Sequence, residues 1–331
     1  MATSFGSEFA ATMGTATYVD GAWTSSVLDR TGPLTLSPAA HALHYGSSCF
    51  EGLKAHKGVD GVVRIFRLDA HVARMRRSAE MLYLPVPPTE QLTALITDVV
   101  AANLAEAPDA PGALYLRPVL LGTEPNIGAA ARPSETALLY VLASPVGDYF
   151  DSSRTLTVAV ETELPRTTPQ FGEIKTGANY AMALGVTRRA MAEHDADQVL
   201  FAPGGEIQET GAANFLMIDG DTVVTRALDT SFLHGITRDS VLRLARSEGL
   251  EVEERTLTVD ELAGCVDTAE AVLAGTAAVL APVGHLVIDG KSVQVRDGQM
   301  GPHTAHLRET LLAIQRGQAE DPFGWTTVVE G

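Results

Sequence analysis

The sequence predicts an α/β protein made of two domains. Its 331 residues are enough for two domains of ordinary size, each with its own core. Strand-like runs alternate with amphipathic helical patterns, and a turn-rich segment interrupts this alternation near the middle of the chain. We therefore expect a small N-terminal α/β domain over residues 1–145, a connector over residues 146–153 and a larger C-terminal domain over residues 154–331.

The first half contains strand and helix patterns in turn. Residues 1–16 are small and polar, and we expect them to form a flexible arm. Residues 61–66 have a strand pattern. Asp69 can cap a helix that reaches Met81, and Thr89 can cap a second helix whose apolar residues recur at helical spacing. Residues 137–142 are typical of a buried strand.

The domain boundary is expected near residues 144–153. Residues 144–150 combine serine, proline, glycine and aromatic residues in a turn-rich run. Beyond it, residues 156–160 and 271–273 are typical of buried strands. Turn signals at residues 203–205, 219–221 and 289–290 predict hairpins, and a helix is expected from Thr237 to about Ser247, ended by Gly249.

The composition excludes several classes of function. A formal net charge of −17 provides no basic footprint for nucleic acid or an anionic membrane. There is neither an apolar stretch of about eighteen residues nor a signal-peptide pattern, so we expect a soluble, cytoplasmic protein. Cys49 and Cys265 are far apart, and His41 and His44 have no third ligand, so we expect no disulfide and no metal.

One of only four lysines has a distinctive setting. Lys57 and Lys291 lie beside turn signals, and Lys54 has no evident anionic partners. Lys175 lies in the segment Glu-Ile-Lys-Thr-Gly-Ala-Asn-Tyr that ends at Tyr180 and leads into a helix-like run. This makes Lys175 the candidate catalytic lysine.

A carboxylate with a matching setting follows later in the chain. Glu209 lies in a glycine- and alanine-rich turn between two strand-like runs, where the backbone can approach a ligand. Together with Lys175 and Tyr180 it suits pyridoxal phosphate. The lysine would form a Schiff base and transfer a proton, the carboxylate would keep the ring nitrogen protonated, and the tyrosine would bond the phenolic oxygen.

Five motifs occur in an order that resembles a known family. They are His-Ala-Leu-His-Tyr-Gly-Ser-Ser-Cys-Phe-Glu-Gly-Leu-Lys from His41, Leu-Tyr-Leu-Arg-Pro from Leu114, the Lys175 segment, Gln-Glu-Thr-Gly-Ala-Ala-Asn-Phe from Gln208, and His-Gly-Ile-Thr-Arg-Asp from His234, with Ala-Gly-Thr-Ala-Ala from Ala274 as a further match. The segments from Lys175 onward, in that order, resemble class IV, fold-type IV pyridoxal-phosphate enzymes. Within that class, the segments from His41 and Leu114 resemble branched-chain amino acid aminotransferases. The resemblance covers roughly residues 18–325 and implies a cofactor in the cleft between the two domains.

The resemblance also implies a set of site residues. On the residues alone, Arg74 could belong to a solvated helix face and Thr237 to an ordinary capped helix; the family favours phosphate binding by both. The expected cofactor residues are Arg74, Lys175, Tyr180, Glu209, Ile236, Thr237 and Thr276. The expected substrate residues are Tyr45, Phe50, Gly52, Tyr115, Arg117, Tyr149, Thr276, Ala277 and Ala278. In the family Tyr45 and Tyr149 reach the site from the neighbouring subunit, so a homodimer is implied.

The implied activity is the transamination of L-leucine, L-isoleucine and L-valine with 2-oxoglutarate. Tyr115 and Arg117 alternate on a short strand and would offer a hydroxyl and a positive charge to a carboxylate. One alternative is a relative of the same fold, either a D-amino acid or (R)-amine transaminase or an aminodeoxychorismate lyase. Another is a non-catalytic binding protein, which the joint presence of Lys175, Tyr180 and Glu209 disfavours.

Overall fold

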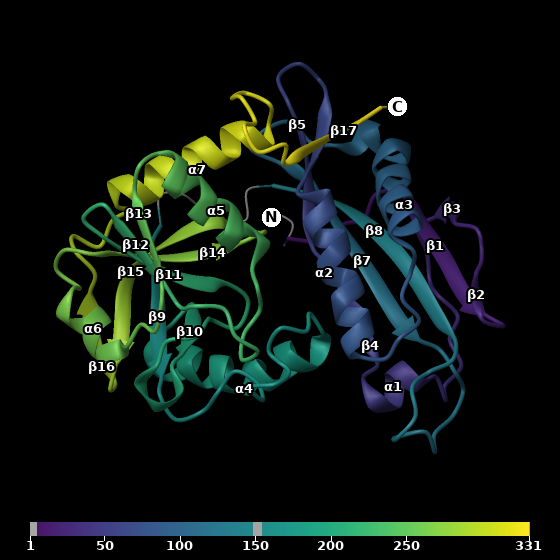
Figure 1. Ribbon diagram of the computed structural model, residues 1–331, viewed down its shortest axis with the longest axis horizontal. Helices are drawn as coiled ribbons and strands as arrows, with labels where there is room; N and C mark the ends of the chain where they lie inside the picture. Colours follow the sequence, from purple (N-terminus) through teal and green to yellow (C-terminus); the bar gives the residue numbers. More distant parts are fainter. Residues whose placement is uncertain (1–4, 148–153, 331) are drawn as a thin grey trace. The chain divides into compact units, whose positions relative to one another are not determined.

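The structure is a computed structural model that describes residues 5–147 and 154–330. The chain divides into two compact units. The first unit comprises residues 1–149, 174–177 and 313–331, and the second comprises residues 150–173 and 178–312. The prediction of an α/β fold is confirmed, because each unit combines one large sheet with helices (Figure 1).

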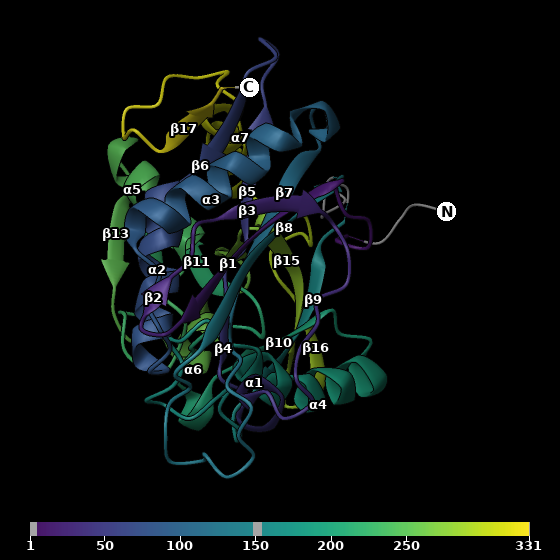
Figure 2. The same ribbon diagram turned by 90° about the vertical axis from the view of Figure 1, so that its right-hand side faces the viewer.

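The first unit is built on a sheet that has nine strands within the described residues. Every pairing in it is antiparallel. Its main path runs through β17 (Thr326–Val329), β6 (Val63–Phe66), β5 (Leu53–Lys57), β7 (Ala113–Gly122), β8 (Ala137–Val146), β1 (Thr12–Val19) and β2 (Ala22–Trp23), with β3 (Val27–Arg30) beside β1 and β4 (Ser48–Phe50) beside β7 (Figure 2).

Helices α2 (Leu68–Met81) and α3 (Thr89–Ala102) form the core of this unit with one face of the sheet (Figure 1). Both were predicted, and their buried residues follow helical spacing. The predicted caps at Asp69 and Thr89 were wrong, because Arg67 and Pro88 are the N-cap residues and neither helix has a side-chain cap. On β7 the side chains of Leu114 and Leu116 point into this core. Because side chains alternate along a strand, Tyr115 and Arg117 lie on the opposite face. The remaining helical segments are α1 (His41–Tyr45) and a 3₁₀ turn at Leu104–Glu106.

Three features differ from the predicted boundaries. Strand β1 begins at Thr12, within the expected arm, because Met13 and Ala16 are buried while β1 pairs with β8. Strand β8 extends to Val146, so the turn-rich run begins inside the sheet, where it pairs with β7. Residues 313–331 group with the first unit, because β17 pairs with β6.

The second unit contains a mixed sheet with eight strands in the described residues. β9 pairs in parallel with both β10 and β15, and β12 pairs in parallel with β13. The path runs through β10 (Gln198–Phe201), β9 (Leu156–Glu161), β15 (Val279–Ile288), β14 (Glu270–Gly275), β11 (Asn214–Asp219), β12 (Thr222–Thr225) and β13 (Glu251–Glu254), with β16 (Lys291–Gln294) beside β15.

The helices of this part of the chain are α4 (Gly177–His194), α5 (Ile236–Ser247), α6 (Val259–Gly264) and α7 (Pro302–Gln315), with a 3₁₀ turn at Pro203–Gly205. The predicted hairpins at residues 219–221 and 289–290 are confirmed as the β11–β12 and β15–β16 turns. In the predicted helix near residue 237, Gly235 is the N-cap, so a cap at Thr237 was wrong. No helix in residues 5–147 or 154–330 is long and apolar enough to cross a membrane.

Candidate active site

Lys175 belongs to the first unit, where its backbone is held on both sides. Its N–H donates to Ser78 Oγ at 3.1 Å, and its carbonyl accepts from Phe50 N–H at 3.0 Å. Ser78 lies on α2 and Phe50 ends β4, so two elements of the first unit fix this short segment. The Lys175 Nζ atom lies 5.2 Å from the centroid of the Phe50 ring, in the range of a cation–π contact.

Four of the predicted substrate residues form one cluster, and the Phe50 ring is part of it. The guanidinium carbon of Arg117 lies 4.7 Å from the Phe50 ring centroid, and Arg117 Nη2 donates to the Tyr115 hydroxyl at 2.8 Å. A Cβ atom at Gly52 would lie 2.0 Å from that hydroxyl, so a side chain there would force Tyr115 to move. Arg117 Nε is buried and has no hydrogen-bond partner among the described residues, which leaves a donor for a ligand.

A buried carboxylate holds Arg74 in the first unit. Glu51 is 1% exposed and binds Arg74 through two hydrogen bonds, Nε to Oε1 at 2.6 Å and Nη2 to Oε2 at 2.9 Å. His71 Nδ1 lies 2.7 Å from Oε2. Burial of Glu51 opposes ionisation, but Arg74 and His71 outweigh it and hold the carboxyl pKa well below its usual range. Burial also lowers the pKa of His71, and the neighbouring Glu51 carboxylate opposes this effect.

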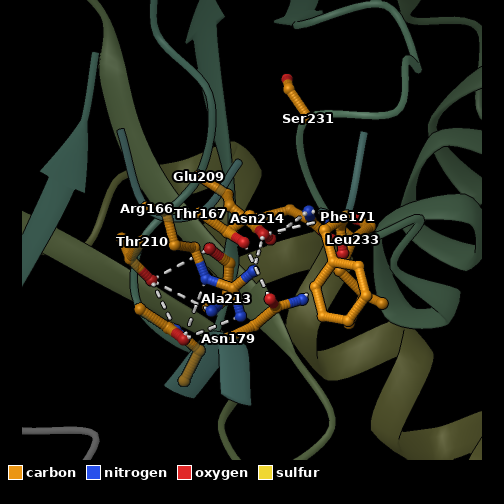
Figure 3. Close-up of polar contacts among 12 residues, drawn as sticks. Arg166, Thr167, Phe171, Asn179, Glu209, Thr210, Ala213, Asn214, Ser231 and Leu233 are labelled. Atoms are coloured by element: carbon orange, nitrogen blue, oxygen red, sulfur yellow. Dashed lines mark hydrogen bonds and ion pairs between the residues drawn. The ribbon is translucent and has the colours of Figure 1, made fainter. Parts of the chain in front are cut away.

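Glu209 lies in the second unit and is held by one ion pair and two hydrogen bonds (Figure 3). The chain reverses after β10, and Phe201 N–H donates to the Glu209 carbonyl at 3.0 Å. Its Oε1 atom lies 2.7 Å from Arg166 Nη1 and accepts a hydrogen bond from Leu233 N–H at 3.0 Å. Its Oε2 atom accepts a hydrogen bond from Asn214 Nδ2 at 3.1 Å. Since both oxygens are engaged, the carboxylate plane cannot turn freely.

The other predicted cofactor residues of the second unit lie around Asn214. Asn214 pairs with Ala274, so the Glu209 loop and the turn at Thr276–Ala278 leave the sheet side by side. A Cβ atom at Gly235 would lie 1.8 Å from Asn214 Oδ1, which places the start of α5 beside the same residue. No side chain caps that helix, so its first N–H groups, including those of Ile236 and Thr237, can face an anion.

Tyr180 is linked to the same carboxylate through Arg166. The guanidinium carbon of Arg166 lies 5.4 Å from the Tyr180 ring centroid, and its Nη1 faces Glu209. Tyr180 is in the first turns of α4. The residue before it in that helix, Asn179, is buried and accepts a hydrogen bond from Thr167 Oγ1 at 2.8 Å.

The structure thus brings most predicted residues into two half-sites, one in each unit. The first contains Phe50, Gly52, Arg74, Tyr115, Arg117 and Lys175, and the second contains Tyr180, Glu209, Ile236, Thr237, Thr276, Ala277 and Ala278. Tyr45 is exposed, and its hydroxyl donates to the Ile127 carbonyl away from Phe50. Tyr149 lies outside the described residues.

Sequence reasoning missed three polar residues that organise these half-sites. Arg166 and Asn214 hold Glu209, and Glu51 holds Arg74. Asn214 and Glu51 occur inside the quoted motifs, so their place in those motifs was a usable signal. No pattern near Arg166 indicates that its side chain is buried, and we find no sequence signal for it.

The donor set fits pyridoxal phosphate. The first half-site supplies an amine and an arginine, and the second supplies a fixed carboxylate, a tyrosine and a helix N-terminus without a side-chain cap. The amine matches an aldehyde, the carboxylate a ring nitrogen and the tyrosine a phenolic oxygen, while the arginine and the helix N-terminus match a phosphate.

Comparison with known proteins identifies the family. The family model of amino-transferase class IV matches residues 48–286. The chain is 39% identical to the branched-chain-amino-acid aminotransferase of Mycolicibacterium smegmatis, covering 93% of this chain and 86% of that one, and 37% identical to branched-chain-amino-acid transaminase 1 of Bacillus subtilis, covering 98% and 94%.

Solved structures agree with the sequence comparison. The branched-chain amino acid aminotransferase of Escherichia coli superposes with a TM-score of 0.80 at 26% identity, covering 98% of this chain and 99% of that one. The branched-chain aminotransferase of the archaeon Thermoproteus uzoniensis with norvaline gives a TM-score of 0.79 at 27% identity, covering 96% and 100%. The chain belongs to the class IV aminotransferase family.

Proposed function

We propose that this chain is a pyridoxal-phosphate-dependent aminotransferase that exchanges the amino group between L-leucine, L-isoleucine or L-valine and 2-oxoglutarate. Relatives named as branched-chain-amino-acid aminotransferases match it at 36–39% identity over 90% or more of its length. Similar solved branched-chain amino acid aminotransferases hold pyridoxamine 5′-phosphate, N-(5′-phosphopyridoxyl)-L-glutamate or 4-methylvaleric acid. The last two are an acidic and a branched apolar ligand.

The proposal rests on the observation that Lys175 and Arg117 both lie next to the Phe50 ring. Both side chains lie over the Phe50 ring, at 5.2 Å and 4.7 Å from its centroid. Transamination of an amino acid needs a base near the Cα–H of the substrate and a cation near one of its carboxylates, a short distance away. The Phe50 ring is a neighbour of both groups and offers an apolar surface to a branched side chain.

Each half-site has a definite part in holding the cofactor. When bound, pyridoxal phosphate withdraws electrons from the substrate Cα and so makes its proton removable. Lys175 would attach the cofactor and afterwards move the Cα proton. Glu209 would accept a hydrogen bond from the protonated ring nitrogen, and Tyr180 would donate one to the phenolic oxygen. The N–H groups of Ile236 and Thr237, with Thr276 and Arg74, would bind the phosphate.

The substrate half-site suits two unlike side chains. Arg117 keeps a buried Nε donor without a partner in the described residues, and it would bind the side-chain carboxylate of glutamate. Phe50 and the aliphatic wall would accept leucine, isoleucine or valine. Tyr115, with the turn at Thr276, Ala277 and Ala278, would hold the α-carboxylate that all substrates share.

We also propose a cytoplasmic homodimer in which Tyr45 and Tyr149 reach the neighbouring site. Support comes from the surface around Tyr45, where Leu43 and Ile127 are 61% and 69% exposed. Mixing Lys175→Ala and Tyr45→Ala chains tests this, because a mixed dimer regains one intact site. Activity that stays at the level of the separate variants after subunit exchange would contradict a shared site.

Visible spectra with and without substrate test the proposed function. The purified chain with pyridoxal phosphate should absorb in the visible range and convert to the pyridoxamine form with L-glutamate or L-leucine. Conversion by D-alanine alone would favour the D-specific alternative, and no visible band at all would favour a binding protein.

Borohydride reduction followed by peptide mapping tests the lysine. The cofactor should be found on Lys175, and Lys175→Ala should lose both the label and turnover. Lys57→Ala is the matched control, since Lys57 pairs with the exposed Asp109 at 2.8 Å. Label on Lys54 would reject the assignment.

A further inference from the structure

Arg166 is a buried cation at the centre of the second half-site. Its side chain is 2% exposed, and it contacts three different groups, of which Figure 3 labels Glu209. Nη1 lies 2.7 Å from Glu209 Oε1, while Nε and Nη2 donate to the Gly211 carbonyl at 3.3 Å and 3.2 Å. The planar end of the side chain also lies over the Tyr180 ring, at 5.4 Å from its centroid.

These contacts leave little freedom to the loop that carries Glu209. The bonds to Gly211 hold the guanidinium to the backbone two residues beyond Glu209, so the cation cannot move without the loop. Arg166 and Leu233 act on Oε1, and Asn214 acts on Oε2. Arginine is suited to this task because its rigid fork can serve several acceptors at once.

A role in stability alone explains this arrangement poorly. Removing two charges from water costs several kcal/mol for each ion, and a buried ion pair is weak evidence for stability. The pair also lies where Glu209 and Tyr180 converge, which a pair serving only the core would not require. A shared neighbour can instead keep the distance between the two side chains constant.

We propose that Arg166 is a positioning residue that acts through Glu209. It fixes the orientation and the negative charge of the carboxylate and holds the Tyr180 ring beside it. The inference rests on the proposed function, in which Glu209 and Tyr180 contact the ring nitrogen and the phenolic oxygen of the cofactor. Arg166 thereby sets the spacing of the groups that recognise these two positions.

A double-mutant cycle on cofactor binding tests the proposal. Pyridoxal phosphate affinity is measured on the apo forms of wild type, Arg166→Met, Glu209→Gln and the double variant. Arg166→Met should weaken affinity about ten- to a hundredfold, the range for a lost charge-assisted contact. The same change in the Glu209→Gln background should have a much smaller effect, because the two residues act as one unit. Independent, multiplicative losses would overturn the proposal.

Two further measurements separate positioning from folding. The pH midpoint of the visible absorbance of the bound cofactor should shift in Arg166→Met and shift less in Arg166→Lys, which keeps the charge; wild-type midpoints in both would contradict the proposal. Arg189→Met, which removes an exposed arginine paired with Glu161, should leave affinity and midpoint unchanged. If Arg166→Met does not fold, the cycle is carried out with Arg166→Lys under the same criterion.

The test of the positioning role of Arg166 is independent of the test of the proposed function. Absence of a spectral response to L-glutamate in the wild type would reject the proposed activity, whatever the behaviour of Arg166. Wild-type cofactor affinity in the Arg166 variants would reject the positioning role, whatever the substrate. The two failures are therefore distinguishable.

Discussion

His56 makes the protein sensitive to acid, and replacing it with leucine should remove part of that sensitivity. The ring lies on β5, is 2% exposed, and neither nitrogen has a hydrogen-bond partner among the described residues. Lys54 lies on the same strand and Arg64 lies directly opposite on β6. Burial, with Lys54 and Arg316, lowers the pKa of His56 from 6.5 to about 3.

The direction of the pH effect follows from proton binding. The folded protein keeps His56 neutral down to about pH 3, whereas the unfolded chain protonates it below pH 6.5. Stability therefore falls as the pH decreases from 6.5 toward 3, and this residue has no effect above 6.5. With about 1.4 kcal/mol for each pH unit, His56 should reduce the free energy of unfolding by about 2 kcal/mol at pH 5.

Urea unfolding at pH 7.5 and pH 5 measures this contribution. Between the two pH values, the wild type should lose about 2 kcal/mol more than His56→Leu, because the titrations of all other groups are common to both. His194→Leu, at an exposed position, should behave like the wild type. Equal losses for wild type and His56→Leu would show that the folded protein accepts a proton at His56.

Three further changes test the half-sites. Gly235→Ala places a methyl group 1.8 Å from Asn214 Oδ1 and should reduce the free energy of unfolding in urea by about 1–3 kcal/mol; an unchanged midpoint would refute the close approach. Glu51→Gln leaves Arg74 without its carboxylate and should destabilise the protein by about 3 kcal/mol at pH 7; a loss no larger than that of the surface change Asp109→Asn would show that the pair is unimportant. Arg117→Leu should lower kcat/KM for glutamate about ten- to a hundredfold and for leucine much less; equal losses would place Arg117 on the α-carboxylate.

Elements with a strong local pattern could be predicted from the sequence. Helices α2 and α3 are examples, because the apolar residues that recur along each helix are the ones that the sheet buries. Strands β1 and β17 were missed because their stability comes from partners far along the chain. β1 pairs with β8, and β17 pairs with β6, and neither partner is evident from local composition.

The same limit applies to the active site. Lys175 and Glu209 could be predicted because chemistry and small neighbouring residues single them out. Arg166 could not, because arginine is usually exposed and its burial depends on a loop and a helix that follow it in sequence. Its importance becomes visible only when the distances to Glu209 and Tyr180 are known.

The two half-sites use the same physical device. In the first unit Glu51 binds Arg74, and in the second unit Arg166 binds Glu209, so each predicted cofactor-binding charge has a buried partner of opposite sign. A chain with a net charge of −17 has no general attraction for a phosphorylated ligand, so recognition must depend on local groups that are already oriented. Fixed partners provide that orientation before the ligand arrives, which removes part of the entropy cost of binding. The preorganisation of the two half-sites therefore accounts for these buried pairs, which are costly to break but are weak evidence for a gain in stability.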